Sequence, residues 1–73
     1  MTNTTQFRKA IEQENAEAVG HDMDLVNRAA RLSFYDEGWQ ELQNECTTEA
    51  ARKAIDQIER RKYRLAEARN NME

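Results

Sequence analysis

Apolar residues recur through the middle of the chain at the spacing of one helical face. Each member of the series lies four or three positions after the one before it, as on a side of an α-helix that packs against a neighbour. The series consists of Leu25, Ala29, Leu32, Tyr35, Trp39, Leu42 and Cys46. It crosses Gly38 without a change of phase, so we expect one continuous helix over residues 23–44. A break at Gly38 is the alternative, because glycine weakens a helix interior.

The last third of the chain carries a second stripe of the same kind. Its apolar members are Ala51, Ile55, Ile58, Leu65 and Met72, and Lys62 and Arg69 fill the remaining positions. The stripe predicts a helix over residues 48–70, with Thr47 as its N-cap. A short link makes neighbouring helices antiparallel, so the two helices should form a long hairpin in which Trp39 lies opposite Ile55.

The N-terminal third predicts a shorter and weaker helix over residues 6–19. Residues 1–4 before it should form a disordered tail. Gly20 follows where a helix commonly ends on a left-handed residue, and Asp22 is suited to cap the next helix. This first helix offers few apolar residues, so it should cover the rest of the molecule only thinly.

These elements predict an all-α fold in a single small domain spanning residues 1–73. A core of this size is marginal, and small domains usually gain support from disulfides, a metal or a second subunit. Cys46 is the only cysteine and His21 the only histidine, so neither an intrachain disulfide nor a multi-ligand His/Cys metal site can form. We therefore expect a homodimeric helical bundle without metal or cofactor. Its core and dimer contacts should come from Met23, Val26, Ala30, Leu32, Trp39, Leu42, Ile55, Ile58 and Leu65.

Residues with catalytic chemistry are few and poorly placed. His21 lies with Asp22 and Asp24 at an expected link between helices, where a chain of this size offers no sheltered cleft for acid–base work. Cys46 follows an acidic stretch, which raises rather than lowers the pKa of a thiol. No glycine-rich phosphate loop or nucleophile motif occurs in the sequence. We expect no enzyme.

Charge is divided unevenly along the chain. The first 46 residues carry four Lys/Arg against nine Asp/Glu, a net charge of −5, whereas the last 27 carry seven against five, a net charge of +2. Lys53, Arg60 and Arg64 share the outer face of the last helix and form the candidate site for DNA or RNA. Asp56 and Glu67 lie on the same face and can pair with the arginines, so a solvated, self-paired face is the simpler interpretation.

A cluster of aromatic and acidic residues near the middle of the chain is the candidate protein-binding surface. Phe34 lies off the main apolar series, on a side of the expected helix that needs cover from the first helix, another subunit or a target protein. Asp36 falls on the core side, where it should bridge to Arg61 or Lys62, or else reach a basic residue of a partner. The candidate partner-binding residues are Phe34, Tyr35, Asp36 and Glu37.

These features favour a protein that acts by binding another protein, because aromatic residues dominate interface hot spots. In size, acidity and helical character the chain resembles the accessory proteins of phages and mobile elements, which implies that it binds and inhibits a host regulator, nuclease or polymerase. A small DNA- or RNA-binding regulator is the alternative, and a structural or assembly chaperone is a third hypothesis. The opening segment MTNTTQFRKA has no apolar signal region, and no apolar run approaches the roughly 20 residues that span a bilayer. We therefore expect a cytoplasmic location and no membrane partner.

Overall fold

The computed structural model describes the backbone of residues 2–71 and the side chains of residues 5–69. Its elements are α1 (Thr2–Glu14), the 3-10 helix η1 (Ala16–Ala18), α2 (Val19–Arg31), α3 (Trp39–Glu45) and α4 (Glu49–Asn71). The described backbone contains no strand, which confirms the all-α class. Among these helices, none combines the length and the apolar character that crossing a bilayer requires.

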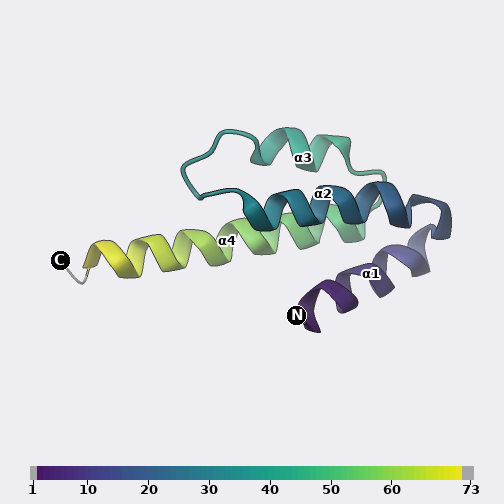
Figure 1. Ribbon diagram of the computed structural model, residues 1–73, viewed down its shortest axis with the longest axis horizontal. Helices are drawn as coiled ribbons and strands as arrows, with labels where there is room; N and C mark the ends of the chain where they lie inside the picture. The colour runs from purple at the N-terminus through teal and green to yellow at the C-terminus, as the bar shows by residue number, and fades with distance from the viewer. Residues whose placement is uncertain (1, 72–73) are drawn as a thin grey trace.

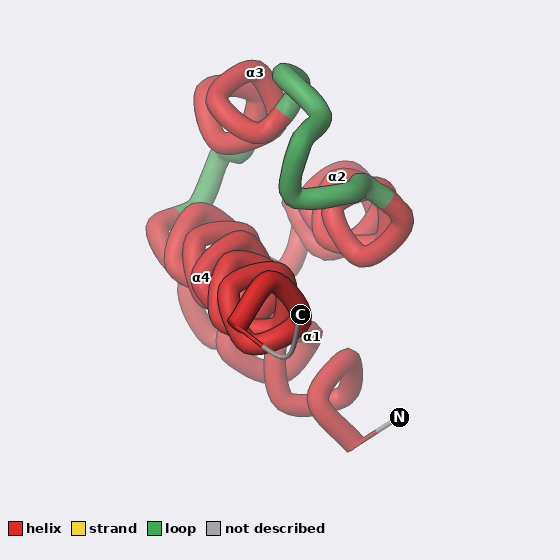
Figure 2. The backbone as a smooth tube through the Cα atoms, turned by 90° about the vertical axis from the view of Figure 1, so that its left-hand side faces the viewer, coloured by secondary structure: helices red, strands yellow, loops and turns green. Residues whose placement is uncertain are grey.

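The helices form a small bundle around a central pair. α2 and α4 lie side by side and run in the same direction, and α1 and α3 lie on opposite sides of this pair and run the other way (Figure 1, Figure 2). Two side chains fix the direction: Asp22, near the start of α2, reaches the start of α4, and Lys62, midway along α4, reaches the end of α2. Neighbouring helices that run in parallel need a returning segment between them, and α3 provides it.

The single helix expected over residues 23–44 is two helices. α2 ends at Arg31, the backbone of Leu32 is extended (φ −73°, ψ 143°), and α3 begins only at Trp39. The chain reverses between them, so that α3 folds back along α2 instead of continuing it (Figure 1). The long hairpin is therefore wrong, and only the short α3 keeps the expected antiparallel relation to α4. The alternative prediction, a break at Gly38, is correct for the end of the interruption, because α3 begins directly after Gly38. The interruption itself already starts at Leu32.

The first helix begins and ends earlier than expected. α1 starts at Thr2, Met1 lies outside the described residues, and the disordered tail over residues 1–4 stays a prediction. The helix ends where Asn15 becomes extended, with its Oδ1 accepting the backbone N–H of Glu17 at 3.1 Å. This is N-cap geometry, and it starts η1 and the turn into α2.

Gly20 and Asp22 lie inside α2 instead of at a junction between helices. No glycine among the described residues has a positive φ, so Gly20 is not a left-handed helix end. A Cβ added at Gly20 would meet no atom within 4 Å, so the residue is not required there by close packing either. The expected helix end at Gly20 and the expected cap of the next helix at Asp22 were both wrong. The chain already turns at Asn15, five positions before Gly20.

The core lies where α2 meets α4 and is closed by one residue of α1 and by α3. Its buried apolar residues are Ile11, Leu25, Val26, Ala29, Trp39, Leu42, Cys46, Ala51, Ala54 and Ile55. Among the residues expected in core or dimer contacts, Val26, Trp39, Leu42 and Ile55 lie in this core, and Met23, Leu32 and Ile58 pack against it half-buried. Ala30 and Leu65 are exposed and do not belong to it. Met72, expected on the same stripe as Leu65, lies outside the described residues.

Side chains from distant parts of the chain cap the start of α4. Thr48, not the expected Thr47, is the N-cap, and its Oγ1 accepts the backbone N–H of Ala51 at 3.2 Å. The carboxylate of Asp22 accepts the two N–H groups just before the helix at 3.0 and 2.9 Å, and that of Glu14 accepts the first two of the helix at 2.7 and 2.8 Å. Helix starts leave N–H groups unbonded and carry partial positive charge. The carboxylates of Asp22 and Glu14 accept these N–H groups and place negative charge beside them. The same bonds tie α1 and α2 to α4.

Candidate functional site

The connection between α2 and α3, residues 32–38, presents aromatic side chains at the surface, and we call it the aromatic loop. Tyr35 is 72 % exposed. Phe34 is half-buried, and its ring packs edge-on against Tyr35 and against Tyr63 of α4, with centroids 5.5 and 5.0 Å apart. Edge-to-face contacts of this kind are favourable. Phe34, Tyr35 and Tyr63 thus form one aromatic cluster that joins the loop to α4.

Hydrogen bonds within the aromatic loop hold its backbone. The carboxylate of Asp36 accepts the Ser33 N–H at 2.7 Å, and the Asp36 N–H donates back to the Ser33 carbonyl at 3.1 Å. The Tyr35 N–H donates to the hydroxyl of Ser33 at 3.0 Å. Ser-x-x-Asp is the pattern of a capping box, which here closes a turn instead of opening a helix. These local partners replace the bonds of a continuing helix and so stabilise the break after α2.

Two side chains anchor the aromatic loop to the rest of the molecule. The buried Trp39 donates from its Nε1 to the Ser33 carbonyl at 3.0 Å. Lys62 donates to the carbonyl of Ala30 at 2.7 Å and to that of Leu32, and its Nζ lies 5.6 Å from the centre of the Trp39 ring. A cation suits the negative end of a helix dipole, so Lys62 caps α2 and holds the loop at the same time.

Acidic charge flanks the aromatic cluster. Asp36 and Glu37 are both exposed on the aromatic loop. The bridge expected from Asp36 to Arg61 or Lys62 is not formed by these described side chains, because Asp36 bonds within its own loop and Lys62 bonds the end of α2. That expectation was wrong because residue 36 does not lie on a helix facing α4. The acids are instead available to solvent beside Tyr35.

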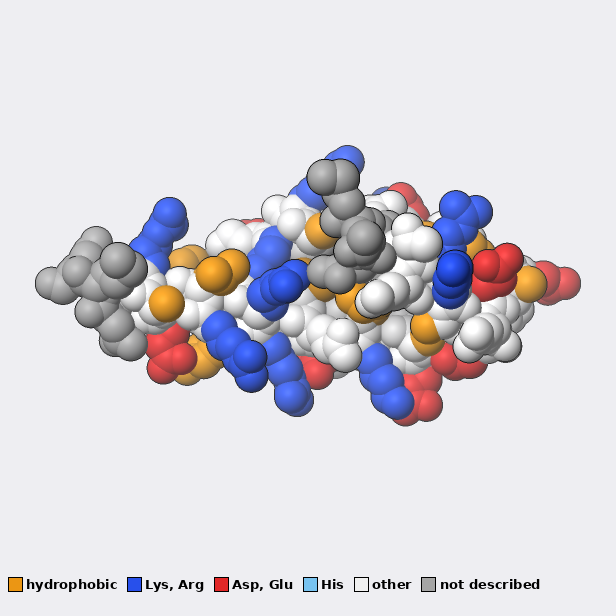
Figure 3. Space-filling view, turned by 90° about the horizontal axis from the view of Figure 1, so that it is seen from below, with side chains coloured by type: hydrophobic (Ala, Val, Ile, Leu, Met, Phe, Trp, Pro, Cys, Tyr) orange, Lys and Arg blue, Asp and Glu red, His pale blue; other side chains and the backbone are white. Residues whose placement is uncertain are grey.

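The expected nucleic-acid residues lie on the solvent side of α4. Lys53 pairs with Glu49 at 3.8 Å and Arg60 with Asp56 at 3.0 Å, so two of the three candidates are neutralised by neighbours on their own helix. Arg64 is exposed and has no part in the ion pairs of the described side chains. In the view from below, Lys and Arg side chains are interspersed with Asp and Glu along the molecule (Figure 3). Such a surface differs from the unrelieved basic stripe of most nucleic-acid binders.

Asp22 is the one completely buried acid among the described side chains. Burial raises the pKa of its carboxyl, but hydrogen bonds donated by Thr48 and Thr47 outweigh that effect and hold the pKa below its ordinary value. An acid that stays ionised and fully bonded serves as a helix cap. His21, its neighbour, is exposed, and its Nε2 lies 3.1 Å from the carbonyl oxygen of Glu45.

The thiol of Cys46 is buried against the start of α4. Burial, together with the charge of Asp22, raises its pKa to about 11. Its Sγ–H donates to the carbonyl of Leu42 at 3.2 Å. A protonated thiol of this kind is a weak nucleophile. Within residues 5–69, no three His, Cys, Asp or Glu side chains gather as metal ligands.

Two residues of the site, Ser33 and Tyr63, were missed by the sequence analysis. Ser33 had a local signal, since Ser33 and Asp36 match the capping-box spacing. Tyr63 had none, because it meets Phe34, 29 positions earlier, only in the folded chain.

The structure thus brings three of the four candidate partner-binding residues to one exposed surface and adds Tyr63 from α4, with Phe34 half-buried among them. Comparisons of the chain with protein-family models, with curated proteins and with solved structures found no match.

Proposed function

We propose that this protein binds another protein through the aromatic cluster and the acids beside it, and that it modulates its partner by covering the surface it binds. Inhibition of a host protein, as by the accessory proteins of phages and mobile elements, is the form of modulation that we propose. The observation that carries the proposal is the exposure of Tyr35, 72 %, on a loop whose backbone is held in place.

Exposed aromatic residues favour a protein partner when their position is set in advance. Tyrosine provides a large contact area with few rotatable bonds, and it is enriched at interface hot spots. Four features hold Tyr35: the turn around Ser33, the anchoring of that turn by Trp39, the capping by Lys62 and the edge-on contact with Phe34. A surface that is already ordered loses less conformational entropy on binding.

The acids beside the aromatic cluster indicate the charge of the partner surface. Asp36 and Glu37 are exposed, and none of the ion pairs of the described side chains involves them. Charges at the edge of an interface steer encounter and select partners of opposite charge. The proposed partner surface is therefore an apolar pocket that accepts a tyrosine and has basic residues at its rim.

A DNA- or RNA-binding role is the second candidate, and one observation favours it. Arg61 and Arg64 are exposed within two positions of Tyr63, 47 % exposed, so the same stretch of α4 carries positive charge and a ring on which a base can stack. The pairing of Lys53 and Arg60 with acids weakens this alternative.

A capture experiment with matched variants tests the proposed function. The tagged chain is used to isolate partners from the cell in which it occurs, and the affinity of the purified partner is then measured by calorimetry. We expect Tyr35→Ser to weaken binding at least about 30-fold, the size of a hot-spot loss of about 2 kcal/mol. Its thermal midpoint should match that of the wild type, because the side chain is mostly exposed.

Charge reversal provides the control. Glu37→Lys should weaken the same complex, whereas Glu12→Lys, an equal charge change at an exposed position of α1, should not. Equal losses in both variants would contradict a specific acidic rim. Loss of binding with Arg60→Ala and Arg64→Ala, together with release of the partner by nuclease, would assign the function to nucleic acid instead.

A further inference from the structure

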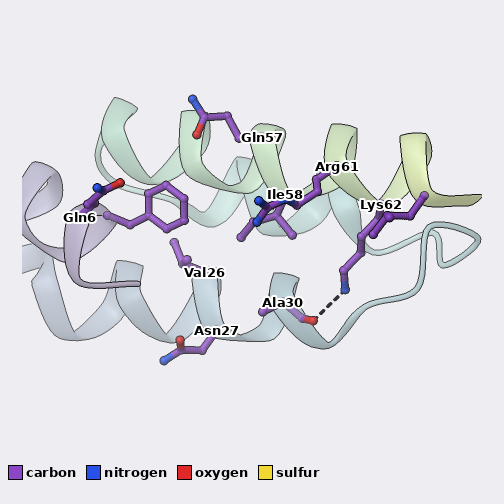
Figure 4. Close-up of a pocket in the computed structure, with 10 residues that line it drawn as sticks. Gln6, Val26, Asn27, Ala30, Gln57, Ile58, Arg61 and Lys62 are labelled. Carbon is purple, nitrogen blue, oxygen red and sulfur yellow. Dashed lines mark hydrogen bonds between the residues drawn. The ribbon is translucent and has the colours of Figure 1, made fainter. Parts of the chain in front are cut away.

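A second surface feature, separate from the aromatic cluster, is an open groove of about 530 Å³ between α1, α2 and α4. In Figure 4, Val26 and Ala30 of α2 line one side and Ile58 of α4 the other, with Gln6 of α1 at one end and Lys62 toward the opposite end. The apolar residues of its lining are Phe7, Val26, Ala30, Ile58 and Leu65.

The groove exists because α1 is shorter than the helix it covers. α1 has 13 residues and α4 has 23, which corresponds to about 20 and 35 Å of helix. Glu14, at the end of α1, is fixed to the start of α4, so α1 covers only the first part of the longer helix. Leu65 lies beyond this cover and is 66 % exposed, although it continues the apolar stripe of α4.

The charges around the groove have one sign. Among the described side chains, its lining includes Arg61 and Lys62 and no acid. Lys62 is occupied with the carbonyls of α2, whereas Arg61 is exposed and belongs to none of the ion pairs of the described side chains. The segment of α4 over residues 59–69 carries five Lys/Arg and two Glu, a net charge of +3, whereas residues 1–58 carry six against eleven, a net charge of −5.

These charges argue against a second copy of the chain in the groove. Two α4 segments laid against each other would oppose like charges, which is unfavourable. The other three α-helices use their apolar faces for the core, as Ile11 of α1, Leu25 of α2 and Leu42 of α3 show. They have no comparable apolar face left to place in the groove of a neighbour.

We propose that the groove binds an amphipathic helix of a partner protein whose polar edges are acidic. The lining spans residues 57–65 of α4, about 12 Å or two helical turns. A helix laid there would anchor by apolar residues at i, i+3 or i+4, and i+7, the usual mode of helix-in-groove recognition. Its acidic edge meets Arg61, and Leu65 and Ala30 take the apolar anchors.

A pair of synthetic peptides tests this assignment. The probe is a fluorescein-labelled 16-residue amphipathic helix with leucines at i, i+4 and i+7 and glutamates along both edges. Its twin has a lysine in place of every glutamate. We expect the acidic peptide to bind the full chain at least tenfold more tightly than the basic one, measured by fluorescence anisotropy at low salt.

Variants on the exposed side of α4 locate the binding. Leu65→Ser should weaken binding of the acidic peptide at least tenfold, and Arg61→Glu should reduce the preference for the acidic over the basic peptide at least threefold. Tyr63→Ser, two positions from Leu65 but in contact with Phe34, should leave the affinity within twofold. Because neither partner capture nor Tyr35 enters the measurement, its failure would leave the proposed role of the aromatic cluster intact.

Three results would overturn the assignment. The first is equal affinity for the two peptides, or an affinity that Leu65→Ser does not change. The second is sedimentation of the chain as a dimer that Leu65→Ser converts to monomers, which would make a second copy the occupant. The third is displacement of the acidic peptide by a single-stranded oligonucleotide that binds more tightly, which would assign the surface to nucleic acid. Circular dichroism confirms for each variant that the helices are retained.

Discussion

At the scale of single residues, two charged side chains hold the molecule together at opposite ends of α2. Asp22 accepts hydrogen bonds from the backbone and side chains of Thr47 and Thr48, and Lys62 donates to carbonyls at the end of α2. Burying a charge is unfavourable unless it is fully bonded, and the buried carboxylate of Asp22 meets this condition. These residues therefore set how α2 and α4 lie against each other.

Asp22→Asn should destabilise the protein and change its response to acid. Asparagine replaces an acceptor with a donor that faces N–H groups, so buried donors lose their partner at a cost of about 2–3 kcal/mol. Because the folded-state pKa of Asp22 lies below its ordinary value, the carboxylate contributes stability above the unfolded-state pKa and loses it as the pH falls through the folded pKa. Urea unfolding should show a large gap between wild type and variant at pH 7 that narrows below about pH 4.

The control for this prediction is Asp24→Asn, which changes an exposed carboxyl two positions away. It should cost less than about 1 kcal/mol, the usual value of a surface pair. A gap between the wild type and Asp22→Asn that stays constant down to pH 2 would contradict the role of the ionised carboxylate.

At the scale of elements, the ends of the helices explain the fold better than their interiors do. α1 ends where Asn15 caps η1. α2 ends where Lys62 donates to its last carbonyls and the chain enters the turn around Ser33. α4 begins where Thr48 and two acids bind N–H groups at its start. The glycines contribute little to these ends. Both have negative φ, and Gly38 precedes α3 with φ −79° and ψ −2°.

Gly20→Ala should stabilise the protein. Gly20 lies inside α2 with open space where a Cβ would be, and alanine is favoured over glycine in a helix by about 0.5–1 kcal/mol. For a domain of this size we expect the thermal midpoint to rise by about 3–6 °C. The sign of the change is decisive, because a left-handed residue at this position would make alanine destabilising. Gly38→Ala, outside the helices and near Leu32, is the comparison, and it should have a smaller effect.

At the scale of the whole molecule, the bundle occupies one part of α4 and the helix extends beyond it. The molecule measures 46 × 24 × 16 Å, and α4 forms most of its length (Figure 1). Packing against the core reaches Ile58, Lys62 bonds the end of α2, and the next contact along α4 is that of Tyr63 with Phe34. Stability should therefore depend on the chain up to Tyr63 and only slightly on the residues C-terminal to it. The homodimer that we expected stays a prediction.

Shortening the chain locates this boundary. A chain that ends at Leu65 should melt within about 4 °C of the full chain, since exposed residues contribute about 0.5 kcal/mol or less. A chain that ends at Arg61 also lacks Lys62 and Tyr63 and should lose its cooperative transition or melt at least about 10 °C lower. Calorimetry of the two shortened chains checks this. Equal melting temperatures for both would show that neither Lys62 nor Tyr63 is an anchor.

Part of this structure could be predicted from the sequence because it depends on local pattern. The helix over residues 48–70 was predicted to within one residue of α4 because its four-three pattern keeps one phase and the segment contains neither glycine nor proline. The burial of Trp39 likewise follows from its place in an apolar series within a polar chain. The exposure of Glu37 follows from the same pattern, because this acid lies outside the apolar series.

The path of the chain between these elements was decided by the tertiary structure. Helical spacing shows which face of a segment is apolar but not which segment covers it, so α2 and α3 satisfy one continuous pattern although the chain reverses between them. The contacts that decide the reversal join residues far apart in sequence: Asp22 with Thr48, Lys62 with Leu32, and Tyr63 with Phe34. Each of these contacts joins a polar group or a ring to a partner that comes within reach only when the chain has folded.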